Sequence, residues 1–223
     1  INGISLLLTL AIAIPTGIVL AGNAGRKREK VLRILLLSFY TVPVFLLGSL
    51  FILFLATPGI GLGILPGIGV SHFIQGKDDF WTWAAANASR LILPVATLTL
   101  HSLAMFALQM KGALLEIFRQ PFLQTARAKG LPEQHVFWKH AFPNALSPLV
   151  SLLVTTFPSV ITGSLVIDYL FALPGMGSKT QEAFMNGDVP LITAILMIIA
   201  LFTVVSQFLG DILYKKMDPR VQY

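Results

Sequence analysis

The chain has 223 residues with a formal net charge of +6; 55% of them are hydrophobic, only 12% are charged, and the mean hydropathy is +0.79. Soluble domains carry roughly 25% charged residues, so this composition excludes a soluble globular protein and indicates an integral membrane protein. The lack of cysteine excludes disulfides and thiolate chemistry, and too little polar chain remains to fold a domain that binds nucleic acid.

Five stretches are apolar enough to cross a bilayer as helices, which takes about 20 residues. They are residues 2–22, 34–57, 88–110, 146–170 and 190–213. The third and fourth contain Thr, Ser, His and Pro, which lipid tolerates mainly on faces buried in protein or lining a cavity, so we expect these two to be inner helices. We expect kinks at Pro15, Pro43, Pro94 and Pro158. The sequence therefore predicts an all-α polytopic bundle, with residues 1–223 forming a single transmembrane domain.

The basic residues predict the topology. Of the 16 Lys and Arg residues, all but Lys77, Arg90 and Lys179 follow the first span, follow the third span or lie in the C-terminal tail. The positive-inside rule makes these segments cytoplasmic, including a loop at residues 111–145, and puts the first residue of this chain outside. Because Ile1 begins directly inside an apolar run, we expect the chain to lack part of its natural N-terminus.

The predicted outer loop at residues 57–89 is rich in glycine and begins with TPGIGLGILPGIG. No G-x-x-x-x-G-K-[ST] pattern follows, so a phosphate-binding loop is disfavoured. Glycine pairs mark irregular backbone, and Trp81 and Trp83 suit a membrane interface, so we predict a flexible or re-entrant outer segment.

The cytoplasmic loop contains the longest polar stretch, QTARAKGLPEQHVFWKHAFPN at residues 124–144. Its pattern predicts a helix over 117–129, a stop at Gly130 and Pro132, and a second helix from Glu133 to Phe142 that ends at Pro143. Two interpretations are open. The loop is either a basic amphipathic connector on anionic lipid or a rigid element that docks a cytoplasmic partner, and the residues alone favour the connector.

This stretch resembles the EAA loop of ABC-importer permeases. Ala126 and Gly130 match the family pattern, and Pro143 stands where its proline is expected. TARAKGL followed by KHAFPNALSP looks like the dipeptide, oligopeptide and nickel branch, as do VIDYLFALPGMG and the closing DILYKKMDPRVQY. The family's Glu and first Ala are Gln124 and Thr125 here, and its usual Glu before the outer P-G-x-G is Asp168.

The resemblance implies a type I ABC-importer permease fold, with six helices in the full-length protein, in a bacterial or archaeal inner membrane. Such permeases pair with a second, similar permease, bind cytoplasmic ATPase subunits and receive peptides or similar small solutes from an outer binding protein. The implied ATPase-coupling residues are Gln124, Thr125, Ala126, Arg127, Ala128, Lys129, Gly130 and Pro143. The sequence has no Walker A motif, so ATP hydrolysis is expected on partner subunits, and no cofactor is implied.

The fourth span carries Ser147, Ser151, Thr155, Ser159 and Gly163 at fourfold spacing. Small residues let membrane helices approach closely, so packing is favoured over a role in the transport path, but the two are compatible. Ser151, Thr155 and Ser159 are the path candidates.

The remaining polar residues give little support to other functions. An ionisable residue within a span is a functional candidate, but a packing histidine is the favoured interpretation of His101. The spacing of His72, His135 and His140 indicates no metal site, and no catalytic constellation is apparent. The chief alternative, an ion-coupled secondary transporter, requires inverted repeats and carboxylates at the bilayer midplane, which the sequence does not show.

Overall fold

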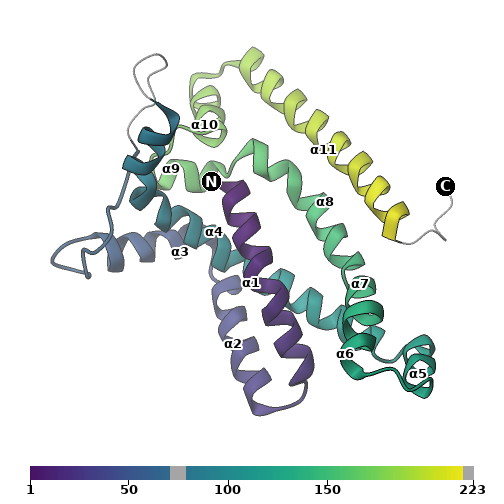
Figure 1. Ribbon diagram of the computed structural model, residues 1–223. Coiled ribbons are helices and arrows are strands. Elements are labelled where there is room, and N and C mark those ends of the chain that lie inside the picture. Colours follow the sequence, from purple (N-terminus) through teal and green to yellow (C-terminus); the bar gives the residue numbers. More distant parts are fainter. Residues whose placement is uncertain (71–78, 218–223) are drawn as a thin grey trace. The chain divides into compact units, whose positions relative to one another are not determined.

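The computed structural model describes residues 1–70 and 79–217, and the sequence-derived all-α class is confirmed there (Figure 1). Apart from one isolated bridge between Pro58 and Gly61, the regular structure of these residues is helical. The helices are α1 (Asn2–Gly22), α2 (Lys27–Thr41), α3 (Val44–Phe51), the π-helix η1 (Ile52–Ala56), α4 (Phe80–Ile117), α5 (Pro121–Ala128), α6 (Glu133–His135), the π-helix η2 (Val136–Ala141), α7 (Phe142–Ala145), α8 (Ser147–Thr162), α9 (Leu165–Leu170), α10 (Met176–Asn186) and α11 (Val189–Met217).

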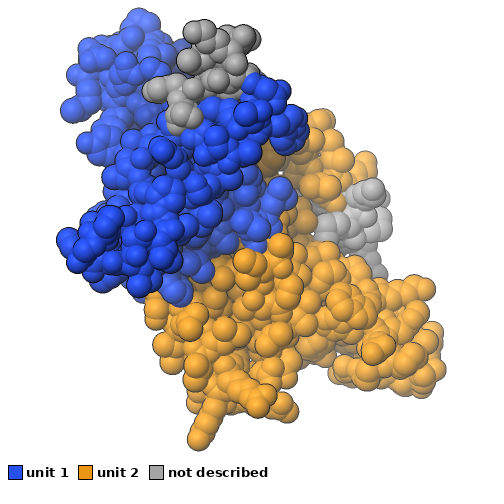
Figure 2. All heavy atoms as spheres, turned by 60° about the vertical axis from the view of Figure 1, so that its left-hand side comes forward, with its two compact units in different colours: residues 1–8, 39–101, 159–201 blue, residues 9–38, 102–158, 202–223 orange. Residues whose placement is uncertain are grey.

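The chain forms two compact units (Figure 2). Unit 1 comprises residues 1–8, 39–101 and 159–201, and unit 2 comprises residues 9–38, 102–158 and 202–223. Among the Lys and Arg residues that the structure describes, only Arg90 and Lys179 lie in unit 1. The charge asymmetry behind the predicted topology therefore follows the same division.

Four predicted spans are confirmed as apolar stretches long enough to cross a membrane, and three of them are single helices. The first has the expected bounds, Asn2–Gly22. The third and fifth are longer than predicted, at Trp81–Ile117 and Val189–Leu213. Pro94 lies inside α4 without ending it, because neighbouring groups in membrane helices can satisfy the backbone carbonyl that a proline leaves free.

The prediction of one helix over residues 34–57 is wrong. The chain bends by 97° between Lys27–Thr41 and Val44–Ala56. Pro43 has φ −52° and ψ 135°, an extended conformation that precedes α3. Proline has no N–H to donate and disfavours helical geometry in the residue before it, so the expected kink is a complete break.

The predicted fourth span, residues 146–170, is confirmed within the longer apolar stretch Glu133–Leu170, but it is not one uninterrupted helix. The α8 helix ends at Thr162, and Gly163 has φ +74°, which glycine adopts without steric cost. Ser164 then caps α9, and its hydroxyl accepts a hydrogen bond from the N–H of Ile167 at 3.4 Å. A left-handed glycine followed by a new N-cap therefore separates two helices within this apolar stretch.

Close packing of α1 against α4 builds the core of unit 2. A Cβ at Gly17 would stand 2.5 Å from Met110 Cβ and 2.7 Å from the carbonyl oxygen of Ala107, so only glycine fits there. The same core contains Leu114 and, from the segment after the cytoplasmic loop, Leu149.

A shielded ion pair joins α2 to α4 in unit 2. Lys111 Nζ donates to Glu29 Oε1 at 2.7 Å, and Arg33 Nε lies 3.5 Å from the same oxygen. The Glu29 side chain is 4% exposed and that of Lys111 15%. Without Lys111, the shielded Glu29 carboxylate keeps only Arg33, which is farther away and 42% exposed, and this costs more than removing both charges together.

Lys111→Met should therefore lower the unfolding temperature of the purified protein in detergent, and adding Glu29→Gln should recover part of the loss. Tryptophan fluorescence during heating measures both. Lys179→Met is the control, because Lys179 and its partner Glu182 are 66% and 56% exposed and such pairs contribute little. Equal unfolding temperatures for the single and double variants would show that the pair is not coupled.

Candidate functional site

The loop at residues 111–145, which the sequence predicts to be cytoplasmic, has a hydrophobic core of its own. Leu123 and Ala126 of α5 pack with Val136 and Ala141 of η2, and the exposed fractions of these four side chains are 0%, 8%, 1% and 0%. We call these four residues the loop core. Ile117, Phe118, Leu131 and Phe137 pack around it. The loop is thus a folded helical element and not an extended connector.

Gly130 closes α5 in the way the sequence predicts. Its φ is +76°, in the left-handed region. The N–H of Gly130 donates to the carbonyl of Arg127 at 2.9 Å, and the N–H of Leu131 donates to that of Ala126 at 3.4 Å. These two bonds form a Schellman motif, which satisfies the last carbonyls of the helix and reverses the chain.

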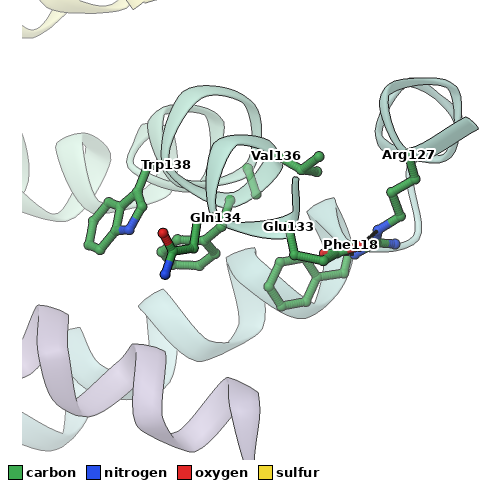
Figure 3. A pocket seen from close by; sticks show the side chains of 8 residues that line it. Phe118, Arg127, Glu133, Gln134, Val136 and Trp138 are labelled. Carbon is green, nitrogen blue, oxygen red and sulfur yellow. Dashed lines mark hydrogen bonds and ion pairs between the residues drawn. The ribbon is translucent and has the colours of Figure 1, made fainter. Parts of the chain in front are cut away.

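An ion pair connects the two sides of this turn. Arg127 Nε and Nη2 donate to Glu133 Oε1 and Oε2 at 2.9 and 3.3 Å, as Figure 3 shows. Both side chains are well exposed, at 41% and 71%, so the pair contributes geometry more than stability. Sequence reasoning missed it, although opposite charges on either side of a Gly-x-Pro turn were a readable signal.

A shallow hollow of about 290 Å³ lies beside the ion pair. Its walls include Phe118, Arg127, Glu133 and Trp138 (Figure 3). Trp138 is 59% exposed and Phe122, on α5, is 43% exposed. Two large aromatic side chains are therefore accessible on a loop that is otherwise polar at its surface.

Two predicted helix bounds in this loop are wrong. The first helix begins at Pro121 and not at residue 117, because Gln120 is extended and Pro121 suits the first helical turn. The second continues past Pro143 to Ala145. Before Pro143 the helix includes the π-helix η2, at whose end the N–H of Phe142 donates to the carbonyl of Phe137, five residues back, and α7 then contains Pro143. A π segment readjusts the hydrogen-bond ladder, and here it leads directly into the turn that contains Pro143.

The predicted coupling residues fall into two groups. Ala126 belongs to the loop core and is buried. The others are exposed and are available to a partner: Gln124, Thr125, Arg127, Ala128, Lys129, Gly130 and Pro143. Sequence reasoning missed Trp138 as an accessible residue, and the signal was a tryptophan within a polar stretch.

The path candidates Ser151, Thr155 and Ser159 are all exposed on α8. The hydroxyl of Thr155 donates to the carbonyl oxygens of Ser151 and Leu152 at 3.3 and 3.0 Å. Because these side chains are exposed, close packing within this chain does not explain their small size.

A buried carboxylate organises the predicted outer segment in unit 1. Asp168 is 5% exposed, and its Oδ2 accepts a hydrogen bond from the N–H of Gly177 at 3.0 Å. A Cβ at Gly163 or Gly177 would come within 2.9 or 2.7 Å of that oxygen, and one at Gly175 would come closer still. The P-G-x-G glycines therefore make room for Asp168.

Gly175→Ala should destabilise this segment, and Asp168→Ala should relieve part of the effect. The three atoms nearest to a Cβ at Gly175 all belong to Asp168, and Gly175 itself has an ordinary φ of −111°. The double variant should therefore lose less thermal stability than the sum of the two single losses. Additive losses would contradict the steric explanation.

His101 lies against Tyr40 in unit 1. The ring centroids are 5.7 Å apart and the planes are inclined by 24°. Its Nδ1 is buried and has no hydrogen-bond partner among the residues that the structure describes. The packing interpretation of His101 stays a prediction. Within the same described residues, no three His, Cys, Asp or Glu side chains gather as a metal site would require.

These features define an α-helical polytopic membrane protein. It has long apolar helices, a folded loop rich in basic residues, and a buried Asp168 carboxylate surrounded by glycines. The chain belongs to the family of binding-protein-dependent transport system inner membrane components, whose model matches residues 13–223. This assignment gives no support to the ion-coupled alternative, and it fits an inner-membrane location.

The chain is similar to two oligopeptide transport permeases. It is 31% identical over 214 residues to OppB of Haemophilus influenzae, covering 96% of this chain and 65% of that protein. It is 31% identical over 220 residues to AppB of Bacillus subtilis, covering 99% and 67%. The chain thus spans about two thirds of the length of these relatives.

The fold is similar to a chain of the MetNI methionine ABC transporter in an inward-facing conformation. The TM-score is 0.70 at 18% identity, covering 97% of this chain and 91% of that one. At this identity the likeness shows the fold alone, and it supports the type I permease fold that the sequence implies.

Proposed function

We propose that this chain is part of the transmembrane permease subunit of an ATP-driven importer and that it passes peptides or similar small solutes. Family membership supports the class of transporter, and the names of the two oligopeptide permeases support the class of cargo. The observation that carries the mechanism is the cytoplasmic loop, a folded helix-turn-helix with its own core and an exposed outer surface.

The loop would act as a rigid contact to cytoplasmic ATPase subunits. The loop core and the Schellman turn fix the direction of α5, so a force on its exposed face moves the whole element. Rigid-body movement of this kind is a common way to transmit a two-state change. Gln124, Thr125, Arg127, Ala128 and Lys129 supply the polar contacts, Gly130 and Pro143 shape the loop, and Phe122 is the apolar anchor.

The exposed face of α8 is the proposed wall of the transport path. Ser151, Thr155 and Ser159 would line it, or would meet the second permease, with the outer binding protein delivering the solute. These 223 residues contain no cysteine, so a single cysteine introduced at one of these positions is the only one among them that a thiol reagent labels. If added peptide protects these cysteines from labelling, they line the transport path. If they cross-link to the second permease, they lie at the interface between the two permeases.

The direct test is capture of the ATPase subunits by the full-length permease in detergent, with the peptide-importer ATPases of the same cell. Phe122→Asp should reduce capture at least tenfold, because it puts a charge into an apolar contact. The matched control is Phe184→Asp, on α10 at the predicted outer side, where the side chain is 58% exposed. If the native chain captures no ATPase, or if both variants behave alike, the proposed docking role is wrong.

A further inference from the structure

The cytoplasmic loop brings together two histidines that are five positions apart in the sequence. The ring centroids of His135 and His140 are 5.9 Å apart, with the planes inclined by 62°. His135 is exposed and His140 is half-buried. We propose that these two imidazoles bind one divalent transition-metal ion, such as Zn²⁺, at the surface of the loop.

The π-helix explains why the two side chains meet. In an α-helix, residues five apart are about 140° apart around the axis and point in different directions. The η2 segment directly follows His135, and its ladder joins residues five apart, as the bond from Phe142 to Phe137 shows. An i→i+5 ladder puts residue i+5 one turn along from residue i, as the α ladder does for i+4. The spacing of the two histidines indicates no metal site in the sequence, because α-helical geometry would separate the pair.

The separation of the rings suits a shared ion. Zinc–nitrogen bonds are about 2.0–2.1 Å long, and a ring nitrogen lies about 1.1 Å from its ring centre, so two imidazoles on one ion have centroids roughly 5–6.5 Å apart. The observed 5.9 Å lies in this range. Neither imidazole makes a side-chain hydrogen bond to the residues that the structure describes, so their nitrogens are available. Imidazole nitrogen is a suitable ligand for Zn²⁺, Ni²⁺ and Cu²⁺.

Two protein ligands make an open site. No third His, Cys, Asp or Glu joins the pair among the described residues, so water would complete the coordination. The bound ion would tie the residue before η2 to a residue near its end and stabilise the π-helical turn. This site does not depend on the proposed transport function, and either can fail without the other.

Copper titration followed by electron paramagnetic resonance tests the proposal on the full-length protein with a purification tag that lacks histidine. The native protein should bind one Cu²⁺ with two nitrogen ligands, and Zn²⁺ should compete for the site only in large molar excess, because nitrogen ligands bind Cu²⁺ more tightly than Zn²⁺. His135→Asn and His140→Asn should each lower the affinity at least tenfold and leave a single nitrogen in the spectrum. Because both side chains reach the surface, these variants should elute as the native protein does in size-exclusion chromatography.

His72→Asn is the control for copper bound elsewhere, and it should leave both the affinity and the two-nitrogen spectrum unchanged. A two-nitrogen signal that survives His135→Asn or His140→Asn would overturn the proposal, as would a native spectrum with a single nitrogen ligand.

Discussion

Replacing Gly130 by valine should weaken capture of the ATPase subunits by up to about 30-fold. Gly130 has φ +76°, and a Cβ there would meet no atom within 4 Å, so the cost arises from the backbone alone. A left-handed conformation costs a residue with a Cβ about 1–2 kcal/mol, and more when the residue is β-branched. The native turn must form before α5 can dock, so this strain reduces the affinity by at most the corresponding factor, through the fraction of chains in which the turn is formed. Pull-down at graded ATPase concentrations measures the change.

Two controls separate strain at this turn from general damage. Gly130→Asn should lose little, because asparagine tolerates the left-handed region. Gly187→Val introduces a similar strain at the C-cap of α10, where φ is +64° and a Cβ also meets nothing within 4 Å. Because Gly187 belongs to unit 1, this variant should leave capture unchanged. Equal losses at both glycines would show that the assay reports overall stability and not the coupling turn.

Local chemistry made some features predictable. The stop at Gly130 follows from glycine's freedom at positive φ, and the structure confirms it because the hydrogen bonds of a Schellman turn involve only neighbouring residues. The apolar lengths of α1 and α11 were readable for the same reason, since a bilayer demands a fixed length of helix.

Other features depend on context that one sequence does not carry. Pro43 predicts a disturbance, but the size of the bend, 97°, depends on how the two parts pack. Gly163 was interpreted as one member of a small-residue stripe, which obscured its role as a helix end at φ +74°. The π-helix η2 has no clear sequence signature, so the meeting of His135 and His140 could not be predicted.

The roles of the predicted coupling residues also depend on context that one sequence does not carry. A family motif says which positions matter, but not whether each one docks or supports. Ala126 and Ala128 are two positions apart on α5, yet the first is 8% exposed and lies in the loop core while the second is exposed. A side chain added at the first position must displace the core, whereas one added at the second extends from the exposed face of α5.

Ala126→Glu should therefore unfold the loop, and Ala128→Glu should leave it folded. An unpaired carboxylate buried beside Leu123 and Val136, which are 0% and 1% exposed, costs roughly 3–5 kcal/mol. Limited proteolysis with chymotrypsin, which cuts after Phe137 and Trp138, should be much faster for Ala126→Glu than for the native protein. For Ala128→Glu the cleavage rate should stay native.

Capture of the ATPases then distinguishes a residue that supports the fold of the loop from one that contacts the ATPase. Both variants should lose capture, Ala126→Glu because the element is no longer formed and Ala128→Glu because a charge disturbs the exposed face of α5. A variant of a docking residue thus loses capture but keeps the native rate of chymotrypsin cleavage. A variant of a supporting residue loses capture and is cleaved faster. If Ala126→Glu resisted chymotrypsin as the native chain does, the loop core would not hold the element together, and the rigidity on which the proposed coupling depends would be lost.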